Sequence, residues 1–185
     1  MFDDLDEVVL VRHAMPVLQP EIPAVDWELD EQGRAAARAF SGTLPDSAYL
    51  VSSTEPKAMQ TLQEMASGRT VVPEDGFREV HQPIRWCDNY HDLARAYLDG
   101  VVPDGWETHE DLVARFNTAV ARHAAAARAQ GQTLIIGTHG LAATVWLAQH
   151  LPLEPTPTDF WAAIGLPDVI DVDFAGKQAR RRQIS

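Results

Sequence analysis

Two short apolar runs, each followed by a histidine, constrain the fold of this chain most strongly. Residues 8–11 (VVLV) lead directly into Arg12 and His13, and residues 133–137 (TLIIG) lead into a threonine and then His139. Both runs are rich in β-branched residues, so they are predicted to be buried strands. Because ligands bind beyond the carboxyl ends of strands in open α/β sheets, we expect both imidazoles at one sheet edge, beside Arg12.

The rest of the chain alternates strand-like and helix-like segments. Further strands are predicted over residues 49–52, 70–72 and 169–174, and helices over residues 30–40, 55–66, 88–98, 108–131 and 141–151. This alternation predicts a three-layer α/β/α sandwich with a mainly parallel central sheet. Residues 1–185 are expected to form a single domain, because this length suits one domain and the chain shows no internal repeat.

The predicted helices carry capping signals at their starts. Asp30 is expected to cap the first helix, and Ser53 or Thr54 the second. Thr108 with Asp111 resembles a capping box at the start of the fourth helix. A glycine at position 33, in the first turn of the first helix, is unfavourable there. Either a close backbone approach requires it or the helix tolerates it.

Three stretches fall outside this alternation. Residues 73–105 lose their hydrophobic period and mix aromatic, basic and acidic side chains, which is typical of a lid or a substrate loop. Residues 152–168 are predicted to be a proline-rich connection, and residues 177–185 a solvated tail with a basic start. The histidines at positions 91, 109, 123 and 150 are predicted to be surface or capping residues.

Charge and composition exclude several classes of function. Twenty-seven acidic against 15 basic residues give a net charge of −12, which disfavours binding to nucleic acids and to anionic membranes. No apolar run reaches the roughly 20 residues that a membrane span needs. The single cysteine, Cys87, rules out an intrachain disulfide. Together with an acidic N-terminus that lacks a signal-peptide pattern, it predicts a cytoplasmic protein.

The residues at the predicted sheet edge suit the transfer of an oxyanion. A neutral imidazole is a nucleophile, while Arg12 and a helix N-terminus near Thr54 attract an anionic group. Fixed positive groups stabilise the charge that spreads over the transferred group. This pattern predicts a phosphoryl or sulfuryl site with a histidine nucleophile. The chain has no His-Glu-x-x-His spacing and no Cys/His cluster, so neither a metal ion nor another cofactor is expected.

Five segments, in order, resemble the histidine phosphatase superfamily, which includes the cofactor-dependent phosphoglycerate mutases. They are Val-Arg-His-Ala at residues 11–14, Leu-Asp-Glu-Gln-Gly at 29–33, Ser-Ser-Thr-Glu-Pro-Lys-Ala-Met-Gln-Thr at 52–61, Phe-Arg-Glu at 77–79 and Gly-Thr-His-Gly at 137–140. The similarity extends from about residue 8 to residue 174. It implies a phosphoglycerate mutase-like fold.

The resemblance also implies catalytic roles for individual residues. His13 would be the nucleophile that becomes phosphohistidine, while Arg12 and His139 would hold the phosphoryl oxygens. Glu79 would protonate the leaving oxygen and then activate water, which requires a carboxyl group that stays protonated near neutral pH. Lys57 would be a further phosphate-binding residue.

Two positions depart from the family pattern. Lys57 stands where the family has an arginine, so it keeps the charge but loses the planar fork that grips two oxygens. We expect a weaker grip on phosphate or a changed substrate preference. Ala14 stands where the motif has glycine, which is tolerable if its φ is negative and costly if its φ is positive.

These expectations favour a metal-independent phosphatase that acts on a small phosphomonoester, with His81 and Arg85 as candidate substrate contacts. A phosphoprotein substrate is an alternative, because short members of the family include such enzymes. A phosphoglycerate mutase-type phosphotransferase is another, although 185 residues leave little room for the insertions that mutases carry around the site. A weakly active or non-catalytic phosphate-binding module is the third. The sequence does not determine the oligomeric state.

Overall fold

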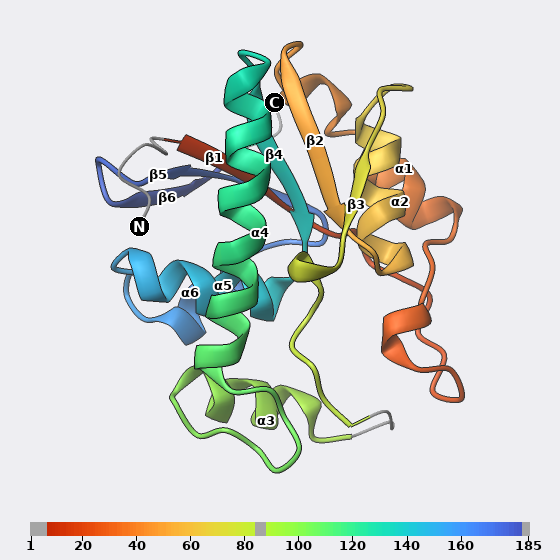
Figure 1. The fold of residues 1–185 in the computed structure, drawn as a ribbon. Coiled ribbons are helices and arrows are strands. Elements are labelled where there is room, and N and C mark those ends of the chain that lie inside the picture. Colours follow the sequence, from red (N-terminus) through yellow and green to blue (C-terminus); the bar gives the residue numbers. More distant parts are fainter. Residues whose placement is uncertain (1–6, 84–87, 183–185) are drawn as a thin grey trace.

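A six-stranded sheet forms the centre of the molecule, with helices on both of its faces (Figure 1). The structure, a computed structural model, describes residues 7–83 and 88–182. The strands, in the order β3-β2-β4-β1-β5-β6, are β1 (Glu7–Arg12), β2 (Ala48–Ser53), β3 (Val72–Glu74), β4 (Thr133–Thr138), β5 (Asp168–Asp173) and β6 (Gln178–Arg181). Strands β1 to β4 run parallel, and β5 and β6 each run antiparallel to the preceding neighbour in the sheet. The predicted, mainly parallel α/β sheet is confirmed.

Side chains that alternate along the strands divide the core into two layers. Val8 and Leu10 of β1 join the larger core, and Val9 and Val11 join the core on the opposite face. The helices are α1 (Glu31–Arg38), α2 (Pro56–Met65), α3 (Tyr90–Leu98), α4 (His109–Ala129), α5 (Gly140–His150) and α6 (Pro157–Ala163), with short 3-10 turns η1 (Ala24–Asp26), η2 (Ser41–Thr43) and η3 (Asp75–Phe77). Helices α1 and α2 cover one face, and α4 and α5 cover the other (Figure 1). No helix in the described ranges is long and apolar enough to cross a membrane.

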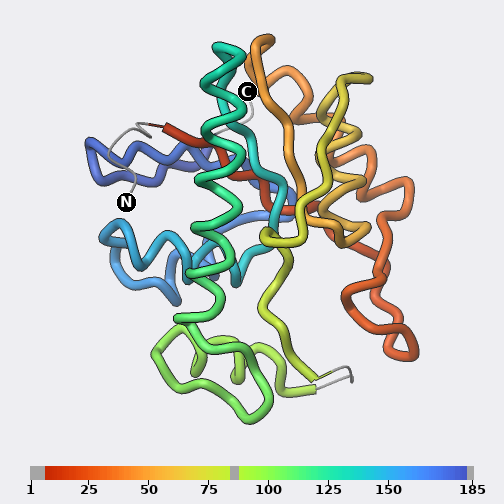
Figure 2. Tube along the Cα trace, viewed as in Figure 1, coloured from red at the N-terminus to blue at the C-terminus, as the bar shows by residue number. Residues whose placement is uncertain are grey.

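The carboxyl ends of the parallel strands meet at one edge of the sheet. Arg12 at the end of β1 lies opposite Thr138 at the end of β4, and Ser52 of β2 lies opposite Gly137. In Figure 2 the red, orange and teal segments that carry β1, β2 and β4 run side by side through the middle of the molecule. The residues that follow β1, β2 and β4 are therefore close in space, although these strands are far apart in the sequence.

Two of the predicted helix caps are confirmed and one is wrong. Asp30 accepts the N–H of Gly33 at 2.8 Å, and Thr108 accepts the N–H of Asp111 at 3.1 Å. Helix α2 instead begins at Pro56, and the residue before it makes no side-chain cap. The hydroxyl groups of residues 53 and 54 are used elsewhere, the first at a histidine ring and the second at Asp75.

Close packing explains the glycine in the first helix and permits the alanine in the first motif. A Cβ atom on Gly33 would lie 2.6 Å from the carbonyl oxygen of Met15, so the close backbone approach requires glycine there. Ala14 is not among the described residues with positive φ, and its N–H donates to Thr61 at 2.8 Å. The methyl group of Ala14 therefore costs no backbone strain.

Several sequence predictions are wrong at the C-terminal end. Part of the predicted tail forms β6, because the basic residues have acidic partners on β5: Arg181 pairs with Asp168, and Arg182 with Asp171. Residues 183–185 lie outside the described residues. The predicted connection after residue 151 contains α6, and the final long strand begins one residue early, at Asp168.

Two predictions on the other side of the sheet also need correction. The third strand is β3, two residues later than predicted, and the segment that follows contains the unpredicted turn η3. The helix predicted over residues 88–98 is confirmed as α3. His123 is buried rather than exposed, because its Nε2 bonds Glu74 at 2.7 Å and its ring lies beside Tyr49. Helix α3 buries Ala94 and Tyr97 in the larger core, so the predicted lid segment is anchored there.

Candidate functional site

The two histidines singled out in the sequence meet at the sheet edge. The ring centroids of His13 and His139 lie 5.1 Å apart in an edge-on arrangement. The backbone N–H of His13 extends the pairing of β1 with β4 by donating to the carbonyl oxygen of Thr138 at 3.1 Å. Both side chains are buried. The expected convergence of the two imidazoles is confirmed.

The hydrogen bonds of His13 determine which nitrogen is free to react. Its Nδ1 lies 2.7 Å from the carbonyl oxygen of Ala14, which only accepts hydrogen bonds, so Nδ1 carries the proton. The lone pair is therefore on Nε2. Burial, followed by the proximity of His139 and Lys57, holds the pKa of His13 well below its ordinary 6.5. The ring is neutral at neutral pH, as a nucleophile must be.

His139 presents an unused nitrogen to the same region. Its Nε2 lies 2.9 Å from the hydroxyl of Ser53, which also accepts the N–H of Glu55. Its Nδ1 is buried and has no hydrogen-bond partner among the described residues. Burial and the nearby cations, first Lys57, hold the pKa of His139 well below its ordinary value. A neutral ring with its proton on Nδ1 has one hydrogen bond left to donate.

Arg12 supplies a second buried donor without a partner. One terminal nitrogen donates to the carbonyl oxygen of Ile164 at 2.6 Å, and Nε has no partner among the described residues. The carboxylate of Asp168 orders the turn behind it by accepting the N–H of Gly165 at 2.7 Å. Nε of Arg12 and Nδ1 of His139 are therefore two buried nitrogens that have no partner among the described residues.

Lys57 lies in the site but is already engaged. Its ammonium group forms a buried ion pair with Glu55 and donates to the carbonyl oxygen of Ala24 at 2.7 Å. Its charge reaches the centre, because it contributes to lowering the pKa of both His13 and His139. An ammonium group has three N–H donors, so one remains for an anion.

Glu79 is held at the amino end of α5. One carboxylate oxygen accepts the N–H of Ala142 at 2.7 Å and that of Val80 at 3.0 Å. The other lies 3.3 Å from the backbone nitrogen of Leu141. Burial raises the pKa of Glu79, and the negative charge of Glu55 adds to that shift. A carboxyl group with a raised pKa keeps its proton to a higher pH than an exposed carboxyl group, which suits a proton donor.

Arg115 of α4 orders the segment that carries Glu79, and sequence analysis missed it. Its guanidinium donates to the carbonyl oxygens of Gly76, Arg78 and Glu79 at 2.8–3.1 Å. It also forms a two-pronged ion pair with Glu107 at 2.7 and 2.8 Å. Nothing in the sequence around residue 115 distinguishes this arginine from a solvated helix arginine, because its partners are distant along the chain.

Of the two candidate substrate contacts, only His81 is among the described residues. The side chain of His81 is exposed, and its backbone N–H and C=O both bond Glu107. Arg85 lies outside the described residues. Their roles stay predictions. Within residues 7–83 and 88–182, no group of three or more His, Cys, Asp or Glu side chains is arranged to hold a metal ion.

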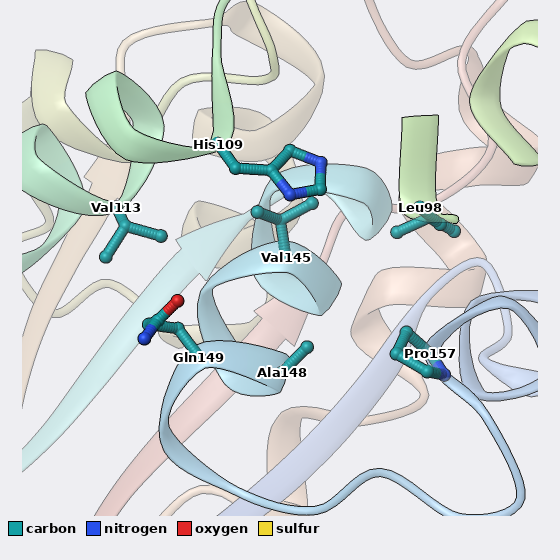
Figure 3. Close-up of a pocket in the computed structure, with 7 residues that line it drawn as sticks. All are labelled: Leu98, His109, Val113, Val145, Ala148, Gln149 and Pro157. Carbon is teal, nitrogen blue, oxygen red and sulfur yellow. The ribbon is translucent and has the colours of Figure 1, made fainter. Parts of the chain in front are cut away.

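A separate hollow of about 170 Å³ lies between α3, α4, α5 and α6 (Figure 3). Its described lining consists of Leu98, His109, Val113, Val145, Ala148, Gln149 and Pro157. Burial lowers the pKa of His109, so the lining offers no positive charge to an anion at neutral pH. The place between the two imidazoles, beside Arg12, is therefore the candidate oxyanion site.

Replacing Gly140 by alanine is expected to weaken phosphate binding about tenfold. A Cβ atom there would lie 2.7 Å from Nε of Arg12, so the guanidinium must shift away from the site. Titration calorimetry with inorganic phosphate measures the effect. The matched control is Gly42→Ala, where a Cβ atom meets nothing within 4 Å. Equal phosphate affinity in both variants would contradict the placement of Arg12.

Comparison with known proteins relates this geometry to a family. The sequence model of the histidine phosphatase superfamily (branch 1) matches residues 8–180. No curated protein matches the chain in sequence. The structure is similar to mycobacterial glucosyl-3-phosphoglycerate phosphatase, with a TM-score of 0.71, 21% identity and coverage of 95% of this chain and 96% of that one.

Two further solved structures share the fold. A phosphoserine phosphatase mutant from Entamoeba histolytica, solved with phosphoserine, has a TM-score of 0.66 and 15% identity, covering 96% of this chain and 95% of that one. YhfR from Bacillus stearothermophilus has a TM-score of 0.67 and 21% identity, covering 95% of this chain and 94% of that one. At these identities the likeness establishes the fold.

Proposed function

Because the chain belongs to the histidine phosphatase superfamily, we propose that it hydrolyses small phosphomonoesters through a phosphohistidine on His13, without a metal ion. One observation carries the proposal: Nδ1 of His13 is held by the carbonyl oxygen of Ala14, which leaves the lone pair on Nε2 beside His139. A neutral, oriented imidazole near two buried nitrogens that have no partner among the described residues suits attack on a phosphoryl group.

The first step transfers the phosphoryl group to the enzyme. The lone pair on Nε2 of His13 forms a bond to phosphorus while the bond from phosphorus to the ester oxygen breaks. Glu79 gives its proton to that oxygen, so the product leaves as a neutral alcohol. Arg12 and His139 donate to the equatorial oxygens, where negative charge spreads in the transition state.

The second step returns the enzyme to its starting state. The ionised Glu79 takes a proton from a water molecule, whose oxygen attacks phosphorus as the phosphorus–nitrogen bond breaks. Inorganic phosphate leaves, the lone pair returns to His13, and Glu79 is again protonated. The hydrogen bonds from Val80 and Ala142 stabilise the carboxylate between the two steps.

The names of two structural neighbours and one segment of this chain support the proposed substrate class. Two structural neighbours carry names that describe phosphatases of small metabolites, glucosyl-3-phosphoglycerate and phosphoserine. We propose that residues 73–105 select the substrate. Helix α3 in this segment places Tyr90 close enough to Glu79 and Arg12 for their charges to act on the pKa of its hydroxyl group.

Turnover of p-nitrophenyl phosphate in the presence of a metal chelator tests this function. We expect hydrolysis at about 1 s⁻¹ or faster, within the ordinary range of enzymes. A panel of phosphorylated metabolites and phosphopeptides then separates the small-molecule and phosphoprotein alternatives. Exchange between phosphoglycerates that is faster than hydrolysis would instead identify a mutase.

A non-catalytic phosphate-binding module is the second candidate, favoured by the ion pair that occupies Lys57. It predicts binding of phosphate with no turnover of any substrate in the panel. The raised pKa of Glu79 and the neutral His13 favour the enzyme, since a module that only binds phosphate requires neither property.

A further inference from the structure

The most unusual group in the site is a second carboxylate, that of Glu55. The side chain is 4% exposed, and it precedes the first residue of α2. Its Oε2 pairs with the ammonium group of Lys57, and its Oε1 accepts the backbone N–H of Glu79 at 2.8 Å. The same Oε1 lies 3.7 Å from Nε2 of His139. Glu55 thus touches three residues of the phosphate site.

These contacts change the charge that a phosphoryl group meets. Both imidazoles are neutral, because their pKa values lie well below the ordinary range. The negative charge of Glu55 offsets the positive charge of Lys57, which leaves Arg12 as the uncompensated cation of this group. Several other titratable or charged groups face Glu55. They are Lys57 on α2, His139 after β4, Glu79 after η3 and Tyr90 on α3, and Arg12 is the further charged group of the site.

We propose that Glu55 is a positioning residue that sets this charge balance: it holds Lys57 as an ion pair and thereby weakens the preference of the site for a doubly charged over a singly charged phosphoryl group. The proposal rests on the proposed function, since it concerns the same phosphate site. Lys57 keeps one N–H for a phosphoryl oxygen, while the nearby carboxylate repels that group. A dianion feels about twice the repulsion that a monoanion feels.

The consequence is a specific dependence on pH. The second ionisation of a phosphomonoester has a pKa of about 6, so the ligand changes from monoanion to dianion within the working range of most enzymes. If Glu55 opposes the second charge, removing its charge strengthens phosphate binding more at high pH than at low pH. A purely structural role would change the affinity by the same factor at every pH.

Titration calorimetry with inorganic phosphate, on the wild type and Glu55→Gln, tests the proposal. The glutamine carbonyl still accepts the N–H of Glu79, while the negative charge beside Lys57 is removed. We expect Glu55→Gln to bind phosphate about tenfold more tightly at about pH 8, with a several-fold smaller gain at about pH 5. The control is Glu110→Gln, an exposed residue with the same change in net charge, whose affinity should match the wild type.

Two further measurements make each outcome decisive. Repeating the comparison in a Glu79→Gln background removes the carboxyl group of Glu79, whose titration would otherwise contribute to the pH dependence. The double variant Glu55→Gln with Lys57→Gln removes both members of the ion pair, so its affinity should lie within about threefold of the wild type. It also tests the proposal if Glu55→Gln alone fails to fold.

The results separate this proposal from the proposed function. A gain for Glu55→Gln that is the same at every pH, or a loss of affinity, would overturn the role of Glu55 alone. A double variant that binds phosphate far more weakly than the wild type would also overturn it, because the two charges would then not cancel. Failure of every variant and of the wild type to bind phosphate would remove the phosphate site itself, and with it the proposed function.

Discussion

Replacing His13 by alanine is expected to lower kcat by about 10⁴-fold while leaving phosphate binding within a few-fold of the wild type. The variant loses the lone pair that attacks phosphorus, and no other imidazole stands in the same position. Arg12, Lys57 and His139 remain in place, so the groups that hold the anion are retained. Steady-state turnover of p-nitrophenyl phosphate and calorimetry with phosphate measure the two effects.

The matched control for this variant is His150→Gln. His150 lies at the end of α5, and its Nε2 bonds Asn117 at 3.0 Å, a contact that a glutamine amide can replace. We expect turnover in this control to equal that of the wild type. Turnover by His13→Ala at the wild-type rate would reject the nucleophile, provided that the variant is folded by circular dichroism.

Replacing Glu79 by glutamine is expected to slow turnover in proportion to the difficulty of the leaving group. An alkyl oxygen must be protonated as it leaves, so we expect a loss of about 10²- to 10⁴-fold for alkyl phosphates. p-Nitrophenolate leaves readily without a proton, so the loss with that substrate should be about tenfold or less at the first step. Single-turnover kinetics separates this step from hydrolysis of the intermediate. An equal loss with both substrates would place the acid on another residue.

The same variant should change the pH profile. The first step needs protonated Glu79, and burial raises the pKa of this group, so the acid form persists to a higher pH than in an exposed glutamate. For alkyl phosphates, kcat/KM should therefore fall as the pH rises through that raised value. Because the pKa of His13 lies well below 6.5, the nucleophile stays neutral in this pH range, and its protonation does not limit the rate. In Glu79→Gln, kcat/KM for alkyl phosphates should no longer fall as the pH rises.

The elements that define the sheet edge were predictable because local patterns specify them. The apolar runs before His13 and His139 have the composition of buried strands, and parallel strands place their carboxyl ends at one edge. The caps at Asp30 and Thr108 are local hydrogen bonds between residues three apart. These features depend on neighbours in the chain, so the sequence alone is enough to read them.

The features that sequence analysis missed depend on contacts between distant residues. Arg115 bonds backbone carbonyls more than 35 positions earlier in the chain, and His123 is buried against Glu74, 49 positions away. Strand β6 forms because Arg181 and the following Arg182 meet acidic partners on β5, whereas composition alone suggests a solvated tail. The ion pair of Glu55 with Lys57 joins near neighbours, yet only burial gives it significance.

The central claim is that His13 carries the phosphoryl group between the two steps. Quenching the reaction in denaturant at alkaline pH preserves the acid-labile phosphorus–nitrogen bond, and mass spectrometry of the proteolysed protein then locates the phosphoryl group. We predict a phosphorylated peptide in which the modified residue is His13, absent from His13→Ala. A phosphoryl group on any other residue, or active enzyme that turns over without a phosphorylated intermediate, would contradict the mechanism.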